Sequence, residues 1–136
     1  MKKIIWPVFI SLLTGCASTV GSQAPDILGE WHIEYIGERP VIDHSPATIT
    51  FERDGRFGGN ASCNRYFGSY TLQGSQIRVD ERVGATKMMC AVEALMEQED
   101  RLFATLPTAV TASIENGILV IRDDEGGLVL KAARTE

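Results

Sequence analysis

The sequence Val110-Thr111-Ala112-Ser113-Ile114-Glu115-Asn116-Gly117-Ile118-Leu119-Val120-Ile121 places apolar residues at every second position before Asn116-Gly117, and apolar residues resume after it. Alternation with a period of two is typical of a strand that buries one face. An Asn-Gly pair between two such runs is the strongest short signal for a hairpin, because both residues accept the positive φ of a type I′ turn. This stretch therefore predicts two antiparallel strands.

The same pattern extends in both directions along the chain. Downstream, residues 123–127 (Asp-Asp-Glu-Gly-Gly) predict a further turn, followed by a strand around Leu128. Upstream, residues 28–36 alternate as a first strand, and two more hairpins are centred on Asp54-Gly55 and Gln73-Gly74. These segments predict about seven strands, mostly antiparallel.

One segment has a helical period. Apolar residues fall three, four or seven positions apart, and polar residues fill the opposite face up to Pro107, which lacks an amide hydrogen and ends the run. The expected apolar positions are Val92, Leu95, Met96, Leu102, Phe103 and Leu106, and the expected polar positions are Glu93, Glu97, Gln98 and Asp100. The predicted fold class is α+β, with this one amphipathic helix packed on the sheet.

The N-terminus has the pattern of an export signal. Two lysines precede an apolar run, too short for a transmembrane helix, that ends in Leu13-Thr14-Gly15-Cys16. This end resembles the lipobox of bacterial lipoproteins, which implies a signal peptide over residues 1–15 and lipidation of Cys16. The alternative is an ordinary signal peptide with an incidental cysteine. Residues 16–26, small and polar, are expected to be a flexible tether.

Three blocks in the middle of the chain indicate a family. They are Gly59-Asn60-Ala61-Ser62-Cys63-Asn64-Arg65-Tyr66-Phe67-Gly68, Ala85-Thr86-Lys87-Met88-Met89-Cys90 and Met96-Glu97-Gln98-Glu99. The blocks and their spacing resemble the META domain family of HslJ-like envelope proteins. Lys87 stands where arginine is usual, and Met89 where alanine is usual. The resemblance implies a small barrel-like antiparallel sheet with one helix over residues 27–133.

Two cysteines remain once Cys16 is assigned to lipid. An exported chain meets an oxidising compartment, so Cys63 and Cys90 are expected to form a disulfide. One alternative is a pair of buried free thiols. Another is a thiol enzyme that pairs one cysteine with His32 or His44, although no feature of the sequence brings a histidine close to either cysteine.

Asn64, Arg65 and Tyr66 bring an amide, a guanidinium and a phenol together in what is expected to be one short loop. The sequence leaves a ligand site open but favours a structural role, because asparagine bonds readily to backbone in turns. Glu99, on the apolar face of the predicted helix, is the expected ion-pair partner of Arg65.

Several function classes are not supported by the sequence. The chain has a net charge of -5 and no basic stripe, which argues against nucleic-acid binding. His32 and His44 lack the spacing of metal ligands, and no cofactor motif occurs, so neither metal nor cofactor is expected.

The chain is therefore expected to be a non-catalytic lipoprotein of the cell envelope. Ala17 after the lipidated cysteine implies the outer membrane, facing the periplasm, if the cell is Gram-negative. The family resemblance implies a role in envelope stress, drug tolerance or envelope integrity. The alternative is a pilotin-like assembly factor that binds a peptide or a lipid tail in an apolar groove beside the helix, lined by Met88, Met96 and Phe103. The expected partners are the membrane, through the lipid anchor, and an envelope protein or a small apolar ligand.

Overall fold

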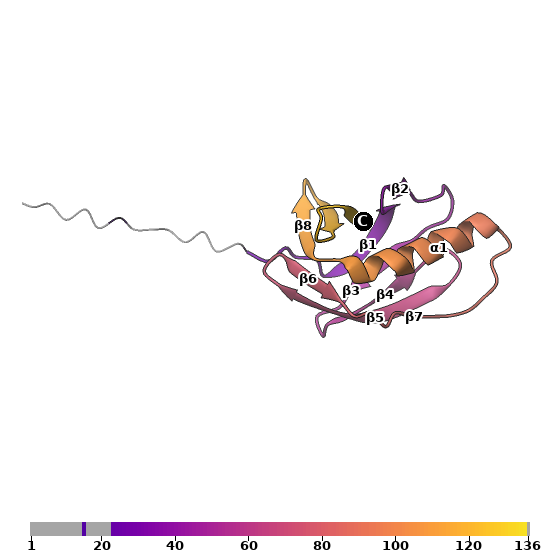
Figure 1. The fold of residues 1–136 in the computed structure, drawn as a ribbon, viewed down its shortest axis with the longest axis horizontal. Coiled ribbons are helices and arrows are strands. Elements are labelled where there is room, and N and C mark those ends of the chain that lie inside the picture. The colour runs from indigo at the N-terminus through magenta and orange to yellow at the C-terminus, as the bar shows by residue number, and fades with distance from the viewer. Residues whose placement is uncertain (1–14, 16–22, 136) are drawn as a thin grey trace, which may run out of the picture.

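In a computed structural model, which describes residues 15 and 23–135, the chain forms one antiparallel sheet and one α-helix (Figure 1). The first six strands are β1 (Gly29–Ile36), β2 (Arg39–Pro40), β3 (Thr48–Phe51), β4 (Arg56–Asn60), β5 (Arg65–Gln73) and β6 (Gln76–Val79). They are followed by β7 (Gly84–Ala85), α1 (Glu93–Thr105), a 3-10 turn η1 (Leu106–Thr108), β8 (Thr111–Glu115), β9 (Ile118–Arg122) and β10 (Leu128–Arg134).

The strands close into an uneven ring. Their order is β10-β9-β8-β6-β5-β4-β3-β1, and β10 also pairs with β1. The short strands β2 and β7 are additions to the ring, paired with β1 and β5. The expected α+β class and barrel-like sheet are confirmed. About seven strands were expected, and the structure has ten, partly because β2 and β7 are too short to show any alternation.

The ring is weakest between β6 and β8. Only Gln76 and Thr111 are in register there. Two backbone hydrogen bonds flank that pair, from the Ile77 amide to the Val110 carbonyl at 3.0 Å and from the Ala112 amide to the Ser75 carbonyl at 2.8 Å. We call this junction the seam.

The core fills the inside of the ring. Alternate residues of the strands point inward, as Trp31 and Ile33 do in β1, and a register shift between Ile33 and Tyr35 turns Ile36 inward as well. The Trp31 indole donates to the Ile27 carbonyl at 2.8 Å, so its one polar atom is satisfied. The largest fully buried side chains are Trp31, Tyr66, Phe51, Ile27, Ile33, Ile36, Ile49, Leu102, Leu106, Leu119, Ile121 and Leu130.

The helix packs on the ring mainly through its C-terminal half. Leu102 is buried in the core, as is Leu106 of η1 directly after the helix, and the Phe103 ring centroid lies 5.7 Å from that of Tyr66. The N-terminal half differs from the expected amphipathic pattern, because Val92 and Met96 are exposed while Gln98 is 0% exposed. The prediction that Gln98 faces solvent is wrong, and the hydrogen bonds described below explain its burial. Within the described residues, no helix is both long and apolar enough to cross a membrane.

Candidate functional site

The predicted disulfide is confirmed. Cys63 and Cys90 are bonded, with their Cα atoms 5.9 Å apart, and both residues are half-buried. Cys63 lies in the loop between β4 and β5, and Cys90 lies in the segment of residues 86–92 that leads into α1. The bond therefore ties the loop that starts β5 to the start of the helix. The alternative of two free thiols is wrong for this state of the protein.

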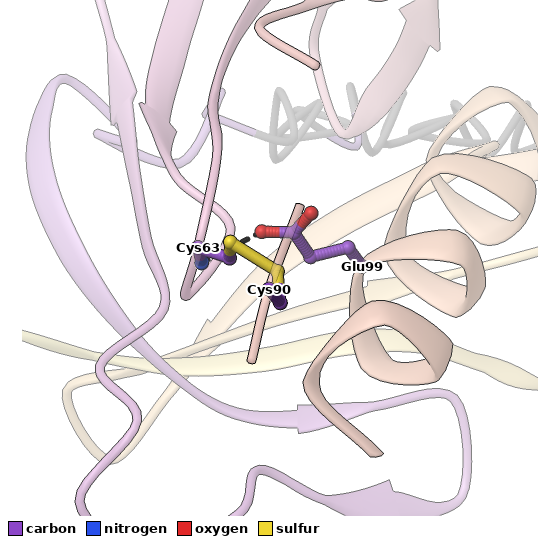
Figure 2. A group of neighbouring side chains, drawn as sticks. All are labelled: Cys63, Cys90 and Glu99. Atoms are coloured by element: carbon purple, nitrogen blue, oxygen red, sulfur yellow. Dashed lines mark hydrogen bonds between the residues drawn. A yellow bond between two sulfur atoms is a disulfide. The ribbon is translucent and has the colours of Figure 1, made fainter. Parts of the chain in front are cut away.

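Glu99 lies beside the disulfide and binds the same loop (Figure 2). Its Oε1 accepts hydrogen bonds from the Cys63 amide at 2.7 Å and the Asn64 amide at 2.5 Å, and its Oε2 accepts one from the Asn64 side chain at 2.8 Å. The residue is only 4% exposed. Three donors surround the carboxylate, which is how a buried acidic group is tolerated.

Asn64 connects this carboxylate to the segment 86–92. Its Oδ1 accepts from the Met88 amide at 2.7 Å and the Thr86 hydroxyl at 2.9 Å, and its Nδ2 donates to the Met88 carbonyl at 3.2 Å as well as to Glu99. The buried amide thus uses both its donors and its acceptor oxygen. The arrangement supports the structural role that the sequence favoured, because the amide has no donor left over for a ligand.

Gln98 forms a second polar connection, which the sequence analysis missed. Its Oε1 accepts from the Ile42 amide at 2.8 Å, and its Nε2 donates to the Ser62 hydroxyl at 2.6 Å. The helix therefore holds the loop of residues 61–64 through two adjacent side chains, Gln98 and Glu99. Among the described residues, no buried side-chain nitrogen or oxygen lacks a hydrogen-bond partner.

Arg65 and Tyr66 differ from the expected loop residues. They begin strand β5, so side chains of adjacent residues point to opposite faces of the sheet. Arg65 is exposed, and the expected ion pair between Arg65 and Glu99 is wrong, because Asn64 and the Cys63 amide hold that carboxylate instead. Tyr66 is buried and donates to the Thr48 carbonyl at 2.7 Å. Burial raises the pKa of the Tyr66 phenol.

Three atoms of kinds that can bind a metal ion lie within 4.8 Å of one another: the sulfur atoms of Cys63 and Cys90 and a carboxylate oxygen of Glu99. Metal binding by cysteine requires thiolate, and both sulfur atoms are committed to the disulfide. His32 and His44 lie elsewhere, both exposed, beside a shallow hollow of about 270 Å³ that Val41 to Pro46 also line.

Exposed apolar side chains flank Cys90 in the sequence, and Met89 among them is 88% exposed. Phe67 on β5 is also exposed, at 64%. We define the 88–96 surface as the four exposed side chains Met88, Met89, Val92 and Met96. Phe103 does not belong to it, because it packs against Tyr66. Met88 and Met96, two of the three residues expected to line a groove, are therefore exposed, whereas Phe103 is partly buried against the core.

A groove does occur at the seam. It has a volume of about 1130 Å³ and lies between the outer end of β6, including Ile77 and Val79, and residues 107–110. Its rim carries charges of both signs, from Arg78, Asp80, Glu81 and Arg82. The groove exists because the pairing between β6 and β8 stops after one residue pair.

Solved structures with a similar fold are known. One is an NMR structure of a protein from Burkholderia xenovorans, with 20% identity, a TM-score of 0.62, and coverage of 79% of this chain and 83% of that chain. Another is a second NMR structure, with 22% identity, a TM-score of 0.59, and coverage of 78% and 89%. A third is a crystal structure of a DUF4847 family protein from Bacteroides vulgatus, with 16% identity, a TM-score of 0.56, and coverage of 80% and 94%.

These likenesses concern the fold alone, since all three identities are low. No curated protein matches the chain. The family model of the META domain matches residues 26–136, which include the disulfide, Asn64, Glu99 and all ten strands. The chain therefore belongs to the META domain family.

Proposed function

We propose that this protein is a lipid-anchored lipoprotein of the cell envelope whose META domain binds a partner in the periplasm without catalysis, and so contributes to envelope integrity under stress. The observation that carries the proposal is the 88–96 surface, where four apolar side chains are exposed within nine residues. Exposed apolar clusters of this kind mark interaction sites more often than scattered single side chains do.

The 88–96 surface is held in place rather than loosely displayed. The disulfide fixes Cys90, Asn64 holds Met88 through two hydrogen bonds, and Glu99 holds Asn64. A surface that is already ordered loses less conformational entropy when a partner binds, which favours affinity. Two methionines also suit a partner of irregular shape, because their side chains are unbranched and adaptable.

The position of this surface agrees with anchoring at the other end of the domain. In Figure 1 the described chain enters on the left, on the side of the view where β6 and β8 are drawn, whereas the segment leading into α1 lies on the right. A lipid on Cys16, which lies outside the described residues, would leave the 88–96 surface directed away from the entry side of the domain. A partner could then reach it without competing with the tether.

A second function is favoured by the groove at the seam. There the edge of β6 beyond Ile77 is paired with no strand among the described residues, and an extended peptide could add to it by backbone hydrogen bonds. This would make the protein a peptide-binding assembly factor of the pilotin-like kind. In Figure 1 the strands β6 and β8 that meet at the seam lie at the opposite end of the domain from the segment leading into α1, so the two functions can be separated experimentally.

Site-specific photo-crosslinking in intact envelopes tests both functions. One variant carries the crosslinker in place of Met89 and another in place of Thr108, which is exposed at the groove. A third carries it in place of Ile114 on β8 as a control for general exposure. We expect a discrete adduct from position 89, lost when Met88→Ser and Met96→Ser are added, and none from position 114.

An adduct from position 108 alone would favour the peptide-binding function and contradict the first proposal. Equal adducts from all three positions would indicate nonspecific contact and contradict both. The lipid anchor needs a separate test: mass spectrometry of the mature N-terminus should find an acylated Cys16, and Cys16→Ser should move the protein from the membrane fraction to the periplasmic fraction.

A further inference from the structure

Cys63, Cys90 and Glu99 lie together where the loop before β5, the segment 86–92 and the helix meet. A carboxylate that is almost completely buried lies beside two sulfur atoms, and ligand-type atoms of all three residues are within 4.8 Å of one another (Figure 2). We propose that reduction of the disulfide converts this group into a binding site for a thiophilic divalent cation of the Zn²⁺ type, with two thiolates and the Glu99 carboxylate as ligands.

The chemistry of the conversion is a two-electron reduction. A dithiol reductant transfers two electrons and two protons, the bond between the sulfur atoms breaks, and two thiols form while the dithiol becomes a disulfide. Zn²⁺ then displaces the two thiol protons and binds the thiolates. Both cysteines are half-buried, so a reductant can approach the bond from the surface.

Contacts independent of the disulfide would keep the ligands together after reduction. Asn64 holds Met88, two residues before Cys90, by hydrogen bonds at 2.7 Å and 3.2 Å. The Thr86 amide also donates to the Arg65 carbonyl at 2.9 Å. The sulfur atoms therefore need to separate only far enough to bind an ion at about 2.3 Å each, a typical Zn–S distance.

Hydrogen bonds hold the Glu99 carboxylate in place beside the two sulfur atoms. The Cys63 and Asn64 amides hold Oε1, and Asn64 Nδ2 holds Oε2 at 2.8 Å, which leaves lone-pair capacity on Oε2. A carboxylate accepts about four hydrogen bonds or metal bonds in all. Hydrogen bonds to a ligating carboxylate orient it, as in other metal sites. Two sulfur ligands and one oxygen ligand suit Zn²⁺ and leave one coordination position for solvent.

Titration of the full chain with Co²⁺, a coloured substitute for Zn²⁺, tests the proposal. After reduction with a phosphine under anaerobic conditions, we expect an absorption band from thiolate-to-cobalt charge transfer that saturates at one ion per chain. The oxidised chain should show no such band. Zn²⁺ should displace Co²⁺ and raise the melting temperature of the reduced chain, because an ion that binds only the folded state stabilises it.

Variants identify the ligands. Cys63→Ser and Cys90→Ser should each abolish the band, and Glu99→Gln should raise the Kd for Co²⁺ at least about tenfold. The matched control is Glu97→Gln, which alters an exposed carboxylate on the same helix and should bind Co²⁺ as the unaltered chain does. If Glu99→Gln does not fold, Glu99→Asp replaces it and should also weaken binding.

The proposal is overturned if the reduced chain shows no more cobalt binding than the oxidised chain, or if the band persists in Cys90→Ser. It is also overturned if Zn²⁺ binds the reduced chain without raising its melting temperature, since the ion would then bind unfolded thiols equally well. None of these outcomes depends on the partner proposed for the 88–96 surface.

Discussion

At the scale of single residues, the fold depends on a carboxylate inside the protein. Glu99 has Gln98 beside it in the sequence, and both face the loop of residues 61–64 from the helix. A buried charge is costly unless donors surround it, and here two backbone amides and one side-chain amide do so. The same contacts hold the end of the loop that leads into β5, so one side chain links helix and strand.

Glu99→Gln should lower the free energy of unfolding by about 2–4 kcal/mol, because it weakens three hydrogen bonds to a charged acceptor. It also places an NH₂ donor against another donor, either Asn64 Nδ2 or the amides of Cys63 and Asn64. Glu97→Gln on the exposed face should change it by less than about 0.5 kcal/mol. Urea denaturation of both variants measures the difference. Equal effects would show that the buried carboxylate has no special role.

The raised pKa values of two tyrosines predict how the free energy of unfolding depends on pH. Burial raises the pKa of Tyr66, and burial together with the charge of Asp54 raises the pKa of Tyr70, above the ordinary value of 10.0. The folded chain therefore keeps phenolic protons that the unfolded chain loses above that value. Stability should be complete below about pH 10 and fall as the pH rises further.

Urea denaturation between about pH 8 and pH 11 measures this decline. Tyr66→Phe removes one of the two phenols and should make the decline shallower. Tyr35→Phe, at an exposed tyrosine, serves as the control and should leave the slope unchanged. If stability declines equally steeply with pH in the unaltered chain, in Tyr66→Phe and in Tyr35→Phe, the assignment of the decline to Tyr66 is contradicted.

At the scale of elements, strand β4 approaches β3 so closely that it tolerates no side chain at one position. A Cβ atom on Gly59 would lie 2.0 Å from the Thr48 carbonyl oxygen, whereas a Cβ atom on Gly58 would lie 3.0 Å from the Tyr66 carbonyl oxygen. The Thr48 carbonyl is also the acceptor for the Tyr66 phenol, so a shift of β3 would disturb the core.

Gly59→Ala should therefore be severely destabilising, by more than about 3 kcal/mol, because backbone must move to relieve the overlap. Gly58→Ala in the same strand should cost less, about 1 kcal/mol, because its neighbour needs to move only slightly. Thermal or urea unfolding of the two variants measures the order. The reverse order would mean that β4 and β3 can separate without loss.

In α1, the burial of a side chain depends on which atoms of the neighbouring elements lie opposite it. Its C-terminal half follows the apolar period, with Leu102 buried, but its N-terminal half meets the polar loop of residues 61–64 and leaves Met96 exposed. Periodicity reports which residues share a face of a helix. It does not report whether that face meets apolar or polar atoms, which is why the expectation for Gln98 failed.

At the scale of the whole molecule, the disulfide joins parts of the chain 27 residues apart. The double variant Cys63→Ser with Cys90→Ser should lose about 3–4 kcal/mol of stability, because the unfolded chain regains the freedom that the loop closure removed. The variant should still fold, because Asn64 and Glu99 hold the same segments. Urea denaturation measures the loss, and circular dichroism checks the fold.

A loss below about 1 kcal/mol would show that hydrogen bonds alone order the loop and the segment 86–92. Complete unfolding would show the opposite, that the cross-link is indispensable. The double cysteine variant and Glu99→Gln both act where the helix meets the loop before β5. Their effects on the free energy of unfolding are therefore not expected to add.

The amino-acid sequence by itself determined the antiparallel class, the hairpins at Asp54-Gly55, Gln73-Gly74 and Asn116-Gly117, the end of the helix near Pro107 and the pairing of Cys63 with Cys90. These are local patterns, or follow from a count of cysteines, so no knowledge of distant contacts was needed. Only the tertiary structure decided that Glu99 binds Asn64 rather than Arg65, that Gln98 is buried, and that the ring opens at the seam. Each of these depends on which atoms of another element lie opposite, and a short-range pattern of apolar and polar residues carries no information about that.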